Sequence, residues 1–148
     1  MWKKNSAVDN SIVLERMINT PIEKVWSAIT EKSKISQWLF PVDDFKPEVG
    51  FEFRFVGGKN DISYLHICRV AEVVAKKKLT FSWRYEGFRG NSFVTFELLP
   101  IGEQTHLKIT HQGLETLPVS NPDFLNGTYT PDWSMMIQSL KTILETNK

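Results

Sequence analysis

A chain of 148 residues is long enough for one domain of ordinary size, which can fold without disulfide or metal cross-links. Its 18 basic and 17 acidic side chains leave a net charge of +1, so no basic field favours a nucleic acid as the main partner. We therefore expect a single domain over residues 1–148, with residues 1–10 flexible or extended.

The sequence also bears on the compartment. The one cysteine, Cys68, cannot form an internal disulfide, and this favours a reducing environment. Two lysines near the N-terminus are not followed by an apolar segment, so we expect neither a secretory signal nor a membrane span. These features predict a cytoplasmic protein.

The first third of the chain predicts one strand and two short helices. Residues 11–19 alternate loosely between apolar and polar side chains and predict a strand. Thr20, Pro21 and Glu23 then form a helix start, in which Thr20 caps, Pro21 takes the first helical position and Glu23 completes a capping box. A second short helix is expected over residues 31–39.

The middle of the chain predicts a series of antiparallel strands. In GFEFRFVGG, residues 50–58, Phe51, Phe53 and Phe55 occupy alternate positions, which indicates a strand with one apolar face. The same reasoning predicts further strands over 62–74, 79–85, 92–99 and 105–111. The segment 62–74 is apolar on both faces and long enough for a bulge, and the short connections between the strands favour hairpins.

The last third predicts a loop and then a helix. Prolines, Asn126 and Gly127 over residues 113–129 indicate a long loop, and loops of this length are often functional or mobile. Thr130 as the cap and Pro131 at the first helical position begin a helix with one wide apolar stripe. The stripe consists of Trp133, Met136, Ile137, Leu140, Ile143 and Leu144.

This order of elements predicts an α+β fold. A curved sheet would receive the apolar stripe of the last helix on its concave face. A sheet folded around one helix seldom closes tightly at both ends, so we expect a cleft between helix and sheet.

Several segments in this order resemble the START-like superfamily, also called SRPBCC. They are TPIEKVWSAITEKSKISQWLFP, LTFSW, THLKITHQG, Trp133 and SLKTIL. The branch that they resemble most is the family named for the activator of the ninety-kilodalton heat-shock protein ATPase, over about residues 11–145. The resemblance implies a helix-grip fold, in which a curved antiparallel sheet wraps around a long C-terminal helix and a pocket lies between them.

The resemblance leaves the function open. Relatives in the wider superfamily bind lipids, sterols, plant hormones or polyketides in this pocket, and a few catalyse cyclisation. The matching domain of the heat-shock activator contacts a chaperone, which would connect the chain with the stress response. Phe51 stands where the family often has a second glycine, so we expect Phe51 to narrow the pocket entrance.

The candidate pocket residues lie on the inner faces of the strands and on the stripe of the last helix. They are Phe51, Phe53, Tyr64, His66, Phe81, Trp83, His111, Trp133, Met136, Ile137 and Leu140. All of them would equally suit an ordinary core. His111 shares the apolar face of its strand, so its ring needs either a buried water or backbone group as partner, or the oxygen of a ligand.

Signals for catalysis are weak. The sequence contains no nucleophile motif and no phosphate-binding glycine loop, and we expect no catalytic residue, no metal and no cofactor. His66 and Cys68 face the same side of one strand and could gather a metal with His111, but their spacing lacks the usual zinc signature.

Three hypotheses for the function follow. The first is a non-enzymatic protein that binds a small hydrophobic ligand between sheet and helix. The second is a co-factor of a chaperone that stimulates a heat-shock protein ATPase. The third is a cyclase or hydrolase that uses His111, Tyr64 or Trp83 in the same pocket.

Overall fold

The computed structural model describes residues 11–59, 61–118, 120–124 and 126–146, so the expectation for residues 1–10 lies outside the described residues. The elements in chain order are β1 (Ile12–Ile18), α2 (Ile22–Thr30), α3 (Lys32–Trp38), β2 (Glu52–Lys59), β3 (Ile62–Val74), β4 (Lys78–Tyr85), β5 (Ser92–Ile101), β6 (Gln104–Gln112), the 3-10 helices η1 (Leu114–Thr116) and η2 (Pro122–Phe124), and α4 (Asn126–Thr146).

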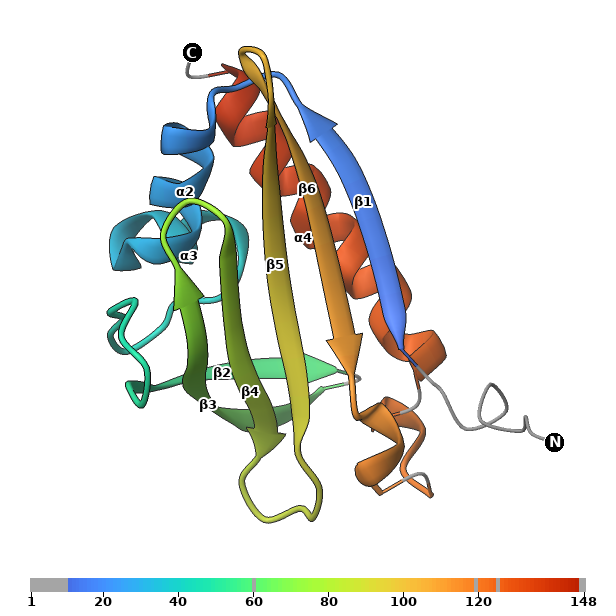
Figure 1. The fold of residues 1–148 in the computed structure, drawn as a ribbon. Coiled ribbons are helices and arrows are strands. Elements are labelled where there is room, and N and C mark those ends of the chain that lie inside the picture. The colour runs from blue at the N-terminus through green and yellow to red at the C-terminus, as the bar shows by residue number, and fades with distance from the viewer. Residues whose placement is uncertain (1–10, 60, 119, 125, 147–148) are drawn as a thin grey trace, which may run out of the picture.

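The strands form one antiparallel sheet of six strands in the order β1-β6-β5-β4-β3-β2. Figure 1 shows the sheet curving around α4, which lies against one face, while α2 and α3 cover one end. Contacts of α4 with β1, α2, α3 and η2 hold the helix in this position. The predicted α+β helix-grip fold is confirmed. Among the described helices, none is both long and apolar enough to cross a membrane.

The alternation predicted for the strands decides which side chains face α4. Along β4, Leu79, Phe81, Trp83 and Tyr85 are buried, whereas Arg84 points to solvent. The bulge predicted in the third long segment is confirmed, because the pairing of β3 with β4 shifts register between Val70 and Glu72.

The strand β5 is longer than predicted, since it continues through Pro100 to Ile101. The last residue of β5 that pairs with β4 is Glu97, so β6 is the only neighbour of β5 beyond that point. The N–H of Leu98 points to the β4 side, where it donates to the Lys77 carbonyl. Two residues on, Pro100 would point its missing N–H to the same, unpaired side, and a proline is tolerated there.

The predicted cap of the first helix is wrong. Thr20 is fully buried, and its hydroxyl donates to the carbonyl of Leu144 at 3.2 Å, while the extended Pro21 occupies the N-cap position of α2. A hydroxyl bound to a residue 124 positions away cannot also cap its own helix. Thr20 therefore ties the start of α2 to the end of α4.

The predicted start of the last helix is also wrong. The helix α4 begins at Asn126, so Pro131 lies inside it and Thr130 is not its cap. The segment 113–129, predicted as a loop, contains η1, η2 and the first turn of α4. The stripe itself is confirmed, because Trp133, Ile137 and Leu140 are buried against the sheet.

Candidate ligand-binding pocket

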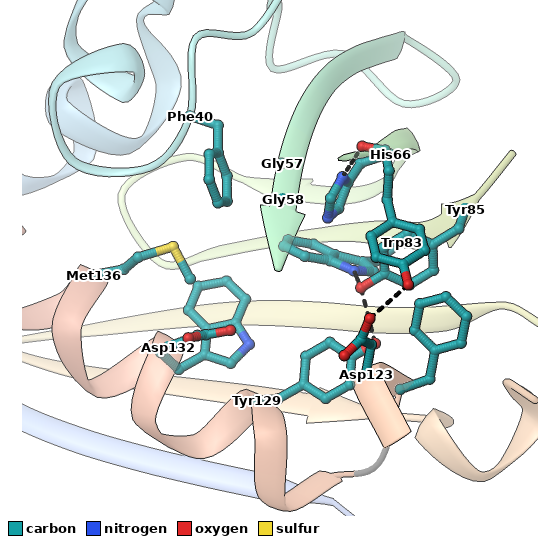
Figure 2. A pocket seen from close by; sticks show the side chains of 13 residues that line it. Phe40, Gly57, Gly58, His66, Trp83, Tyr85, Asp123, Tyr129, Asp132 and Met136 are labelled. Carbon is teal, nitrogen blue, oxygen red and sulfur yellow. Dashed lines mark hydrogen bonds between the residues drawn. The ribbon is translucent and has the colours of Figure 1, made fainter. Parts of the chain in front are cut away.

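A small pocket lies between the inner face of the sheet and the N-terminal half of α4, with a cavity of about 50 Å³. Its lining on the sheet side consists of Gly57, Gly58, Tyr64, His66, Trp83 and Tyr85. Its lining on the helix side consists of Asp123, Phe124, Tyr129, Asp132, Trp133 and Met136. Phe40, from the segment after α3, lies on the remaining side, as Figure 2 shows.

The sheet side of the pocket follows from strand register. His66 on β3 is paired with Tyr85 on β4, and Tyr64 and Trp83 lie two residues away on the same inner face. On β2, Gly57 leaves the space that these rings need. A Cβ atom at Gly57 would lie 2.9 Å from Cε1 of His66 and 3.2 Å from the ring of Phe40. The glycine therefore lets two aromatic rings approach the strand.

A chain of hydrogen bonds crosses the pocket from sheet to helix. The indole Nε1 of Trp83 donates to the hydroxyl of Tyr85 at 2.9 Å, and this hydroxyl bonds that of Tyr129 on α4 at 2.8 Å. Burial raises the pKa of Tyr85 to about 12 and also raises the pKa of Tyr129. Both phenols therefore stay protonated at neutral pH.

The helix η2 is attached to the sheet by a second contact. The hydroxyl of Tyr64 donates to Oδ2 of Asp123 at 2.6 Å, and this hydrogen bond raises the pKa of Tyr64. The ring of Phe124 stacks on Tyr85 with 4.6 Å between centroids. The segment predicted as a functional loop thus supplies one wall of the pocket.

His66 presents one ring nitrogen to the pocket. Its Nδ1 lies 3.1 Å from the carbonyl oxygen of Tyr64, and a carbonyl only accepts, so Nδ1 carries the proton. Burial lowers the pKa of His66 to about 4, and the ring is neutral at pH 7. Its Nε2 then carries a lone pair, and Figure 2 shows this end of the ring pointing into the pocket.

His111 lies behind the pocket wall and not in its lining. The indole Nε1 of Trp133 donates to Nδ1 of His111 at 3.0 Å, so the proton of the imidazole is on Nε2, which bonds Ser92 Oγ at 2.8 Å. Burial lowers the pKa of His111 to about 3. Its partners are two side chains, which was neither of the alternatives predicted, and with both nitrogens engaged it is not placed for acid–base catalysis.

The comparisons with known proteins give the family. The family model described as "Activator of Hsp90 ATPase homolog 1-like protein" matches residues 19–145. The chain belongs to this family. A search of curated proteins finds no match.

Solved structures of similar proteins agree with the fold. Protein MLL2253 from Mesorhizobium loti is 30% identical, and the alignment covers 93% of this chain and 98% of that chain with a TM-score of 0.77. Protein CV1439 from Chromobacterium violaceum is 23% identical, with coverage of 92% and 97% and a TM-score of 0.74. DynU16, a putative protein in the dynemicin biosynthetic locus, is 21% identical, with coverage of 95% and 49% and a TM-score of 0.75. The last two support the fold alone.

Five of the predicted pocket residues line this pocket, and six do not. The lining includes Tyr64, His66, Trp83, Trp133 and Met136. Phe53 and Phe81 instead border a second cavity of about 10 Å³ in the core. Ile137 is fully buried in the core, and Leu140 borders a surface groove beside α2 and α3.

Phe51 is not at the entrance of the pocket. Its ring lies 6.4 Å from that of Phe45, and it does not contribute to the lining of the pocket. The residue at the edge of the pocket is Phe40, which stacks on Phe55 at 5.0 Å. A Phe51→Gly exchange would open space beside Phe45 and not in this pocket.

Several lining residues were missed from the sequence. Tyr85 continues the alternation of Trp83 and could have been included on that ground. Asp123 and Phe124 lie in the segment 113–129, whose length was the only signal. Tyr129 and Asp132 were hidden by the wrong helix start.

Metal chemistry finds no support in the described part of the chain, where no three histidine, cysteine or acidic side chains lie close enough to hold an ion. Cys68 is fully buried, and burial raises the pKa of its thiol well above the ordinary value. Its thiol is therefore not activated as a nucleophile.

Proposed function

We propose that the protein binds a small, largely apolar molecule in the pocket between β3, β4 and α4. The observation that carries this proposal is the cavity itself, which has aromatic walls and one buried ring nitrogen, Nε2 of His66, directed into it. Apolar walls with a few convergent polar groups are the usual composition of a ligand site.

The size of the cavity limits the ligand. A volume of about 50 Å³ is smaller than the roughly 150 Å³ of an apolar cavity that holds benzene. The ligand is therefore a molecule of few atoms, or the walls move to admit a larger one. Phe40 and Met136 are the half-buried members of the aromatic and apolar lining, so their rotation would enlarge the pocket at least cost.

Two adjacent methionines allow a matched test. Met136 lines the pocket, whereas Met135 is 65% exposed on the opposite side of α4. Compounds that raise the melting temperature in a library screen should bind at least tenfold more weakly to Met136→Trp, because the indole fills the pocket. Binding to Met135→Trp should be unchanged. A ligand at 100 times its dissociation constant stabilises a protein by about 2.7 kcal/mol, which such a screen detects.

Two results would refute the proposal. One is a library in which no compound shifts the unfolding transition. The other is a set of hits that bind equally well to both tryptophan variants, which would place their site elsewhere.

A second function, stimulation of a heat-shock protein ATPase, is favoured by the description of the family. It requires a surface that contacts a chaperone. The outer side of the sheet carries the exposed apolar side chains Val13, Met17, Phe93 and Leu99, which suit such a contact. ATPase rates of the ninety-kilodalton chaperone with and without the protein would decide, and an unchanged rate removes this candidate.

A further inference from the structure

We infer that the pocket selects a small organic cation, specifically the protonated form of a short aliphatic amine. This inference rests on the proposed function and adds the charge and hydrogen-bonding class of the ligand. It follows from the balance of donors and acceptors in the lining, from the acidic residues there, and from the aromatic walls.

The hydrogen-bond donors of the lining are almost all used within the protein. The donors already engaged are the indole N–H groups of Trp83 and Trp133, the hydroxyl of Tyr64 and the Nδ1–H of His66. Tyr85 and Tyr129 share one hydrogen bond, so only one of their two hydroxyl protons remains. A ligand that needs donors from these side chains finds at most one.

Acceptors, in contrast, are in excess. Nε2 of His66 carries a lone pair, no described residue donates a hydrogen bond to it, and the side chain is buried. The carboxylates of Asp123 and Asp132 have several lone pairs each, and Figure 2 shows both beside the cavity. A ligand that carries several N–H groups matches this lining, whereas a carboxylate or phosphate meets like charge and few donors.

The charge of the lining has the same consequence. Among the lining residues that the structure describes, two are aspartates and none is lysine or arginine, and His66 is neutral at pH 7. The rings of Trp83, Tyr64 and Tyr129 add the negative faces that attract an ammonium group. Carboxylates with aromatic walls are the combination that recognises amines in water.

The volume sets the size of the amine. Each water needs roughly 10–15 Å³ of such space, so about 50 Å³ holds roughly three to five water-sized groups. This fits an ammonium group with a short branched alkyl chain. The alkyl part would contact Met136 and Phe40, and the ammonium group would lie toward Asp132 and Nε2 of His66.

Three isosteric probes test the inference at pH 7: isobutylamine, isobutanol and isobutyrate, each titrated while protein chemical shifts are followed by NMR. We expect isobutylamine to bind at least tenfold more tightly than isobutanol, and isobutyrate to bind more weakly than either. Isobutanol binding as tightly as the amine would overturn the charge inference and leave the proposed function intact. If none of the three binds while library compounds do, the inference fails alone; if nothing binds, both fail.

Variants of the two aspartates localise the effect. Asp132→Asn and Asp123→Asn keep the shape of the side chain and remove its charge, so each should weaken isobutylamine about tenfold without changing the affinity for isobutanol. Binding of isobutanol also reports that the variant is folded. The matched control is Glu97→Gln, an exposed residue on β5 outside the lining, which should leave both affinities unchanged. Unchanged amine affinity in both aspartate variants would overturn the inference.

Discussion

The hydrogen bond from Trp133 to His111 holds one wall of the pocket and can be tested by removing its acceptor. Trp133 is 1% exposed and its N–H donates over 3.0 Å to Nδ1 of His111. In His111→Leu, the buried N–H loses its only acceptor among the described residues, which costs about 1–3 kcal/mol. The hydroxyl of Ser92 loses one partner but still donates to the carbonyl of Trp83, so it adds little. We expect a total loss of about 2–4 kcal/mol in the free energy of unfolding.

A double-mutant cycle separates this hydrogen bond from packing. In the background Trp133→Phe the donor is already absent, so His111→Leu should cost about 1–2 kcal/mol less than in the wild type. Urea denaturation followed by far-ultraviolet circular dichroism measures all four proteins. His106, on the same strand, has a side chain that is 31% exposed and pairs with Glu15, so His106→Leu should cost less than about 1 kcal/mol. Costs that add to within about 0.5 kcal/mol in the cycle would refute the reasoning.

Two further predictions concern pH and backbone space. Burial lowers the pKa of His66 to about 4 and of His111 to about 3, so only the unfolded chain gains protons as the pH falls below the ordinary value of 6.5. Stability is then complete above pH 6.5 and falls by up to about 2.7 kcal/mol per unit between pH 6 and 5; His111→Leu should halve that slope in urea titrations, and an equal slope would contradict this. Gly90 has φ of 98°, and a Cβ atom there would lie 2.3 Å from the Thr116 carbonyl oxygen, so Gly90→Ala should cost at least about 3 kcal/mol. Gly87 has φ of 84° but nothing within 4 Å of a Cβ, so Gly87→Ala should cost only about 1 kcal/mol in the same assay, and equal losses would show that the clash is unimportant.

Local sequence patterns determined the elements and their faces. The alternation of Leu79, Phe81, Trp83 and Tyr85 predicted one buried side of β4, and the structure has that side against the core. Such patterns are reliable because the side-chain period of a strand is set by its backbone. The apolar stripe that contains Trp133 and Ile137 was equally readable, since helical spacing places these residues on one face.

The ends of helices depended on distant partners. Thr20 and Pro21 match the local pattern of a helix start, yet the hydroxyl of Thr20 binds the carbonyl of Leu144 instead. Pro131 matches the same pattern, yet α4 begins five residues earlier, at Asn126. A local motif predicts which residues can cap a helix, but tertiary contacts decide whether they do.

The pocket was decided by the tertiary structure. The sequence placed Phe53, Phe81 and Trp83 on one apolar side, but only Trp83 reaches the cavity, because the distance between sheet and helix varies along the curved sheet. The contact between Tyr64 and Asp123 joins residues 59 positions apart, so no local pattern could reveal it. What the sequence determined by itself is the family, the elements and their buried faces. Where the buried rings leave space, and which acceptors face it, depends on contacts that exist only after the chain has folded.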